Sequence, residues 1–279
     1  MDPSPLGPPL DVRPLFPEER AALLDLLAAL APADWARPTA CPGWDVRDVT
    51  AHILHGYVRR LSHGRDGHEG GPAPATGEAL PVFLTRANRD FVATARQFSP
   101  RLLRDLIGHL GPQTDAYWTG IAMAGPAGVD VSWASTGAPA PAWLDVAREY
   151  TERWTHQQQI RDAVLRPGAD GPRLLAPVLD TFLRALPHTL RGLDAAAGTA
   201  VRVTVPGDAG GRWTAVRGPE QWELRDSGER PAAEVVVDAD TLWRLATRGV
   251  EPGEALRAAG LRGDRALGEA VLGIVAIVR

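Results

Sequence analysis

The sequence predicts two domains, an all-helical N-terminal domain followed by a small α+β domain. Early in the chain, apolar side chains recur three and four residues apart, as Leu23, Leu27 and Leu30 do, which is the spacing of one helix face. Past Gly198 the period changes to two, and short alternating runs are separated by Gly/Pro turns, which favours an antiparallel sheet. This change of period places the domain boundary at residues 195–199.

The helices of the first domain are predicted from their apolar periodicity and their caps. Pro17 suits the first helical position, and that helix is expected to reach about Ala31. Asp45 is a candidate N-cap for a second helix, with Asp48 in the first turn, where the helix dipole favours a negative charge. This second helix is expected to end near Ser62. Further helices are predicted at 82–98, 99–110, 142–165 and 174–193, the last with a kink at Pro187.

The rest of the chain is assigned from turn residues and alternation. Residues 64–81 predict a long exposed loop, and residues 112–141 an irregular segment with a short strand at 129–133. The first 15 residues carry five prolines and no apolar run, so we expect a flexible tail there. The predicted organisation is therefore a tail at 1–15, a helical domain at 16–197 and an α+β domain at 198–279. Strands are expected around 201–205, 213–215, 222–224 and 235–237, and helices at 240–247 and from 264 onward.

Composition limits the classes of function. All 30 basic residues are arginine, which excludes a lysine Schiff base and a P-loop lysine. The formal net charge is −4 and the arginines are scattered, which argues against nucleic-acid binding. Cys41 is the only cysteine, so an internal disulfide and a multi-cysteine metal site are both excluded. No signal peptide or bilayer-spanning run is evident, and we expect a soluble cytoplasmic protein without a membrane partner.

Three side chains have the types and spacing of a metal site. Glu152 and His156 stand four residues apart on a predicted helix and therefore share one face. With His52 from another helix, they would supply two imidazoles and one carboxylate, a set that leaves coordination positions open for water or substrate. The same spacing is common in solvated or simply hydrogen-bonded pairs, so spacing alone leaves both interpretations open.

Two segments carrying these residues resemble the motifs of a known family. Residues 34–52, DWARPTACPGWDVRDVTAH, resemble the opening motif of the mycothiol-dependent maleylpyruvate isomerase family, and residues 149–163, EYTERWTHQQQIRDA, resemble its second motif. That family belongs to the DinB-like metal-binding four-helix bundles. Residues 233–245 and 261–267 are similar to its C-terminal domain, which has a sterol-carrier-like α+β fold. The resemblance implies this architecture for the whole chain.

The resemblance also implies the ligands and the cofactors. His52, Glu152 and His156 would bind a divalent metal, zinc or else nickel, manganese or iron, with mycothiol or bacillithiol as the thiol cosubstrate. Family members often carry aspartate three residues after the second motif's histidine, where this chain has Gln159. Glutamine accepts a hydrogen bond without bringing a charge, so we expect Gln159 to support a ligand imidazole while the metal's electronics or the substrate differ.

Other residues near the predicted ligands are candidates for substrate binding. His55 lies one turn after His52, and Trp154 falls within the second motif. Arg59, Arg60 and Arg86 are placed to meet an anionic group of the substrate, although solvated surface arginines remain the alternative. Cys41 sits in a Pro/Gly turn with no histidine at an activating spacing, so a packed turn residue is the favoured interpretation. No catalytic residue is identified.

The resemblance implies a metal-dependent and thiol-dependent isomerase or S-transferase that acts on a small electrophilic substrate. A thiolate would add to an electrophilic carbon, and rotation about the former double bond would give isomerisation. Two alternatives remain, a metal-dependent hydrolase that uses metal-bound water and a non-catalytic small-molecule binding protein. The expected partners are the substrate and the thiol, and the sequence leaves open whether the protein is a monomer or a homodimer.

Overall fold

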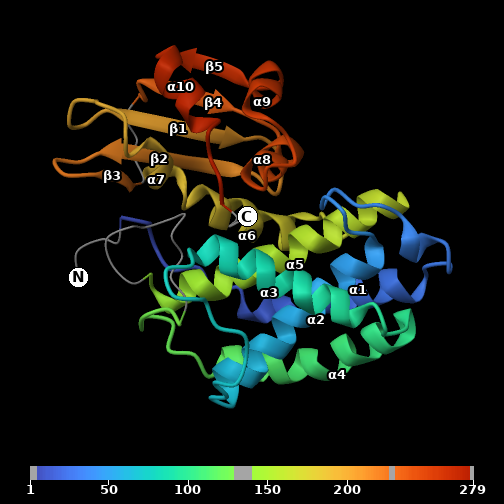
Figure 1. Ribbon diagram of the computed structural model, residues 1–279. Coiled ribbons are helices and arrows are strands. Elements are labelled where there is room, and N and C mark those ends of the chain that lie inside the picture. Colours follow the sequence, from blue (N-terminus) through green and yellow to red (C-terminus); the bar gives the residue numbers. More distant parts are fainter. Residues whose placement is uncertain (1–4, 129–139, 226–229, 277–279) are drawn as a thin grey trace. The chain divides into compact units, whose positions relative to one another are not determined.

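A computed structural model describes residues 5–128, 140–225 and 230–276, and it divides into two compact units (Figure 1). The helical unit consists mainly of Val12–Met123 and Glu149–Asp170. The sheet unit consists of Ala124–Arg148 and Gly171–Ile277 together with Met1–Asp11. The predicted fold class, a helical domain with a small α+β domain, is confirmed. Within the described ranges, no helix combines the length and the apolar character needed to cross a bilayer.

The helical unit contains long α-helices together with short 3-10 and π helices. Its caps follow the sequence: the Asp45 side chain accepts a hydrogen bond from the Asp48 N–H at 2.8 Å, and Ser99 accepts one from the Leu102 N–H at 3.2 Å. The elements in chain order are η1 (Arg13–Leu15), α1 (Phe16–Ala28), η2 (Asp34–Ala36), α2 (Val46–Arg59), the π-helix η3 (Arg60–Arg65), α3 (Leu80–Ala95), α4 (Pro100–Thr119) and the C-terminal part of α5 (Ala142–Val164).

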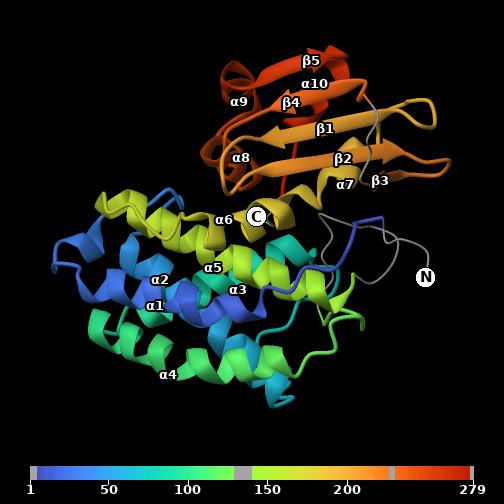
Figure 2. The same ribbon diagram turned by 180° about the vertical axis from the view of Figure 1, so that it is seen from behind.

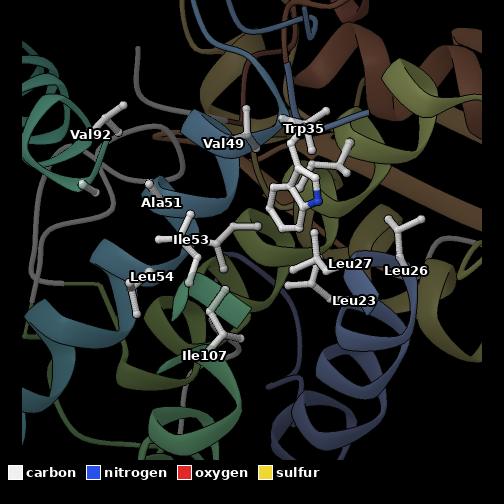
Figure 3. Packing of buried hydrophobic residues seen from close by; sticks show 14 of the residues in the cluster. Leu23, Leu26, Leu27, Trp35, Val49, Ala51, Ile53, Leu54, Val92 and Ile107 are labelled. Carbon is white, nitrogen blue, oxygen red and sulfur yellow. The ribbon is translucent and has the colours of Figure 1, made fainter. Parts of the chain in front are cut away.

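The core of the helical unit is an apolar cluster from α1, η2, α2, α3, α4 and α5 (Figure 3). Leu23 and Leu27 of α1, Ile53 of α2 and Ile107 of α4 are each at most 5% exposed. Burying an aliphatic side chain of this size contributes about 1.5–3 kcal/mol. Because Ile53 directly follows His52, this packing fixes the rotation of α2 and with it the direction in which the His52 side chain projects.

Helix α4 continues through Pro112, whereas the sequence predicted that it would end before this residue. A proline inside a helix lacks an N–H donor and costs about 3 kcal/mol. Tertiary contacts hold the part of the helix that follows the proline. An Arg20 guanidinium nitrogen bonds Asp115 at 2.8 Å, and the Trp118 ring stacks on Phe16 at 6.2 Å and is 1% exposed. The strand that was predicted at 129–133 lies outside the described residues.

The sheet unit holds a five-stranded sheet in the order β3-β2-β1-β4-β5 (Figure 1). Its strands are β1 (Ala200–Val205), β2 (Gly211–Arg217), β3 (Trp222–Leu224), β4 (Ala233–Val236) and β5 (Gly260–Gly263). The expectation of a purely antiparallel sheet was wrong for one pair, because the chain returns after β3 and places β4 parallel to β1. Strand β5 was not predicted, since only Leu261 in it is apolar, and its pairing with β4 defines it.

Helices cover this sheet and its ends. They are α6 (Pro172–Leu183), α7 (Leu186–Leu190), α8 (Ala239–Ala246), α9 (Pro252–Ala258) and α10 (Arg265–Val271). Helices α8 and α9 lie side by side at one end of the strands in both views (Figures 1 and 2). The single kinked helix predicted at 174–193 is instead broken between α6 and α7. Both pieces fall within the sheet unit rather than the helical one, because α6 contacts α8 and α7 contacts β3.

Residues 5–11, part of the segment predicted as a flexible tail, contact other parts of the sheet unit. The Leu224 N–H donates to the Pro5 carbonyl at 2.8 Å. The Arg184 guanidinium donates to the carbonyls of Leu6 and Pro8, the latter at 2.9 Å. Leu6 is 5% exposed. The carbonyls of this proline-rich segment therefore accept hydrogen bonds from distant residues. The proline content alone does not predict these bonds.

Candidate metal centre

His52, Glu152 and His156, the three expected metal ligands, lie close together. The Nε2 atom of His52 lies 3.2 Å from Oε1 of Glu152, and Nε2 of His156 lies 3.3 Å from the same oxygen. The centroids of the two imidazole rings are 4.6 Å apart. One ligand atom from each residue lies within 4.8 Å of the others. Helix α2 supplies His52 and α5 supplies the other two from successive turns, so a single ion could contact all three side chains.

A tightly bonded turn precedes α2 and borders this cluster. The N–H and Oγ1 of Thr39 both donate to the Trp44 carbonyl, at 3.0 and 2.9 Å, and the Trp44 N–H donates to the Cys41 carbonyl at 3.0 Å. Gly43 has a φ of +79°, a conformation that glycine adopts without strain. The turn holds the Trp44 ring 5.2 Å from the His52 ring. A Pro/Gly turn in the sequence thus becomes one wall of the site.

Gln159 lies directly behind His156. The Nδ1–H of His156 donates to Oε1 of Gln159 at 2.7 Å, and the Cys41 thiol donates to the same oxygen at 3.1 Å. Two donors therefore orient the amide so that its oxygen faces the imidazole. This hydrogen bond leaves Nε2, the nitrogen nearest Glu152, as the one that faces the cluster.

The donor set and its surroundings fit a divalent ion. Both ring nitrogens of His156 face acceptor oxygens, from Gln159 and from Glu152, so both carry a proton in the metal-free protein. An ion in place of the Nε2 proton would keep the hydrogen bond from Nδ1, which is the usual arrangement of a ligand histidine. Two imidazole nitrogens and a carboxylate oxygen suit zinc and its neighbours among the transition metals. The Glu152 side chain is 31% exposed, whereas those of His52 and His156 are 11% and 8% exposed.

Burial and mutual contacts shift the pKa values of all three groups. Burial lowers the pKa of His52, and the charges of His156 and Arg59 add to this effect. Burial opposes ionisation of Glu152, but hydrogen bonds with His156 and His52 outweigh it and hold its pKa well below 4.5. Burial likewise disfavours the charged form of His156, yet contacts with Cys41 and Glu152 raise its pKa to about 10. The metal-free cluster therefore contains an ionised carboxylate between one charged and one neutral imidazole.

His55, a predicted substrate residue, is used instead in packing between α2 and α3. Its Nδ1 lies 3.1 Å from the amide oxygen of Asn88, and its ring stacks on Phe91 with centroids 4.3 Å apart. Burial and the charge of Arg59 lower its pKa to about 4. The imidazole is therefore neutral and already engaged by α3.

Arg86 and Trp154 are also engaged elsewhere. The Arg86 guanidinium binds both carboxylate oxygens of Glu78, at 3.0 and 2.8 Å, and lowers the pKa of Glu78 to about 2. Trp154 is 1% exposed, and its indole N–H donates to the Ala169 carbonyl at 2.7 Å. Two residues after Glu152 on α5, it projects about 200° around the helix from the ligand face. The structure does not bring either residue to the ligands.

Arg59 is the predicted anion-binding residue that lies on the ligand side of its helix. It follows His52 by two helical turns, which returns it to about the same face of α2. Its charge lowers the pKa values of both His52 and His55, so its guanidinium lies within electrostatic reach of the cluster.

The sequence did not predict an ion pair between the two ligand-bearing helices or the contact from Cys41. Arg60, which was expected to meet an anionic group of the substrate, is paired with Glu149 instead: a guanidinium nitrogen lies 2.7 Å from Oε1 of Glu149, with both side chains buried. Opposite charges on the inward faces of two predicted helices were the available signal. No sequence pattern indicated the hydrogen bond between Cys41 and Gln159, because the two residues are 118 positions apart.

Comparison with known proteins places the chain within a family. The family model of the mycothiol maleylpyruvate isomerase N-terminal domain matches residues 16–161, more than half of the chain, and this region includes His52, Glu152, His156 and Gln159. No curated protein sequence matches.

Solved structures share the fold across both units. The crystal structure of the mycothiol-dependent maleylpyruvate isomerase is 15% identical, with a TM-score of 0.52, over 89% of this chain and 90% of that chain. A variant of that enzyme with a histidine replaced by alanine is 14% identical, with a TM-score of 0.51 and the same coverage. At this identity the likeness shows the fold, and the family model carries the assignment. The chain therefore belongs to the mycothiol maleylpyruvate isomerase N-terminal domain family.

Proposed function

We propose that this protein is a thiol-dependent isomerase whose active site is a divalent metal centre held by His52, Glu152 and His156. The observation that carries the proposal is the convergence of two imidazole nitrogens on one carboxylate oxygen, with Gln159 bonded behind His156. The family membership supports mycothiol as the thiol and maleylpyruvate as the first substrate to test.

The chain's own residues define what the site does. His52, Glu152 and His156 would hold a divalent ion at three coordination positions and leave the others to the thiol or to water. Such an ion would lower the pKa of a bound thiol, so that a thiolate would be available near neutral pH. Gln159 keeps the proton of His156 on Nδ1 and so keeps Nε2 available as a ligand atom. The Cys41 thiol is used in bonding Gln159, which suits a site whose nucleophile comes from outside the chain.

Isomerisation requires a substrate with an electrophilic carbon–carbon double bond. The thiolate sulfur adds to one carbon and the second carbon takes up a proton, so the double bond becomes a single bond. Rotation about that bond followed by loss of the same proton and the thiolate gives the other isomer, with no net change in atoms. We propose that Arg59 binds an anionic group of the substrate, since a guanidinium presents two parallel N–H donors to a carboxylate.

The test combines metal content with a thiol-dependent assay. Protein purified without chelator is expected to hold about one equivalent of divalent metal, and His52→Ala to lose both the metal and the turnover of maleylpyruvate. His109→Ala is the matched control, because His109 is an exposed histidine on α4. Turnover is expected only with mycothiol or a similar thiol, and the product distinguishes an isomer from an S-conjugate. Hydrolysis without any thiol would overturn the proposal in favour of a metal-dependent hydrolase.

A further inference from the structure

We propose that the buried ion pair between Arg60 and Glu149 is a positioning element for the metal centre. It sets the register of α2 against α5 and thereby the distances between His52 on one helix and Glu152 and His156 on the other. This inference rests on the proposed metal centre, but the packing of the two helices can be measured without a metal.

The pair is held from three elements. The Arg60 guanidinium lies 2.7 Å from the Glu149 carboxylate, and the two side chains are 10% and 6% exposed. The same guanidinium lies over the ring of Trp118 on α4, with its carbon 5.1 Å from the ring centroid. An ion pair on one side and an aromatic ring on the other confine the guanidinium more tightly than either contact alone.

The pair lies two turns from His52 along α2 and one turn from Glu152 along α5. Arg60 follows His52 by eight residues, about 80° around the helix, and Glu149 precedes Glu152 by three, about 60° around it. Two contacts therefore link α2 to α5, the Arg60–Glu149 pair and the His52–Glu152 hydrogen bond, and they are separated by about 12 Å along α2. One cross-link leaves two helices free to pivot, whereas two fix both their sliding and their crossing angle. Arg60 is also the residue at which α2 changes to the π-helix η3.

Metal affinity depends on the register of α2 against α5 more strongly than the folding stability does. The free energy needed to desolvate two charges is nearly as large as the free energy of their attraction. A buried ion pair therefore adds little stability compared with a well-packed apolar pair. A bound ion instead requires its ligand atoms at about 2.0–2.2 Å, and a site built from two helices tolerates displacements of only about 0.5 Å. Loss of the pair is therefore expected to weaken metal binding while the unfolding temperature changes little.

The experiment replaces both charges together, because a single substitution would leave a buried unpaired charge. The test variant is Arg60→Met with Glu149→Leu. The matched control is Arg20→Met with Asp115→Leu, which removes a pair of 2.7 Å whose side chains are 9% and 17% exposed and which joins α1 to α4. Zinc affinity by chelator competition is expected to fall at least about tenfold in the test variant and to stay within about twofold in the control. Unfolding temperatures of the metal-free variants should be similar to each other.

A second measurement is independent of the metal. Spin labels at Val58 on α2 and Asp162 on α5, both exposed, report the distance between the helices by pulsed electron resonance, in a Cys41→Ala background. The distance distribution should shift or broaden in the test variant and not in the control. Arg60→Lys keeps the charge but loses the planar fork, so it should give a smaller shift in case the double variant does not fold.

The outcomes separate the two proposals. Unchanged distances in both Arg60 variants, or equal loss of zinc affinity in the test and control variants, would overturn the positioning role. A parent protein that binds no divalent metal, together with altered distances in the Arg60 variants, would overturn the metal centre and support the ion pair as the element that sets the helix register.

Discussion

Acidification should destabilise this protein through His55. Its pKa falls from 6.5 to about 4 in the folded protein, because the ring is buried against Asn88 and Phe91 and lies near Arg59. A depressed pKa means that the unfolded chain binds the proton more readily, so the stabilisation is complete above pH 6.5 and is lost as the pH falls towards 4. The difference of about 2.5 pKa units corresponds to about 3 kcal/mol of unfolding free energy.

The assay is urea unfolding at pH 7.0, 5.5 and 4.0 in the presence of a chelator, for the parent protein and for His55→Gln. The substitution removes the titrating group, and any packing loss shifts all three values equally. The difference in unfolding free energy between the two proteins should therefore shrink by about 3 kcal/mol from pH 7.0 to pH 4.0. A difference that stays constant across this range would refute the burial of a neutral His55 against α3.

Three further predictions concern the metal site and the helices that build it. Gln159→Leu removes the acceptor for the Nδ1–H of His156 and should weaken zinc binding about 10- to 100-fold, whereas Gln159→Glu should bind at least as tightly; equal affinities by chelator competition would contradict the role of Gln159. Asp45→Ala removes the N-cap of α2 and should cost about 1 kcal/mol in urea unfolding, with Asp45→Asn close to the parent. Leu27→Ala should cost about 2–5 kcal/mol in the same assay, and a loss below about 1 kcal/mol would show that Leu27 is not a core residue.

Local signals predicted the secondary structure well wherever packing agreed with them. The Asp45 and Ser99 caps lie where the residue types require, because a cap is decided within four residues. The end of α4 was misjudged at Pro112, since the contacts that carry the helix past the proline come from Phe16 and Arg20 of α1. Strand β5 was missed for the same reason, because its partner β4 rather than its own composition defines it.

The sequence by itself determined the fold class and the three candidate ligands. Periodicity records which side of each element is buried, and the two motifs carry the residue types and spacing of the site. Only the tertiary structure decided which other residues reach that site. It brings Cys41 and Gln159 together behind His156 and pairs Arg60 with Glu149 between the two ligand-bearing helices. His55, Arg86 and Trp154 contact other residues instead. The reason is physical: these contacts depend on how far each helix is rotated and slid against its neighbours, which long-range packing sets and local sequence does not encode.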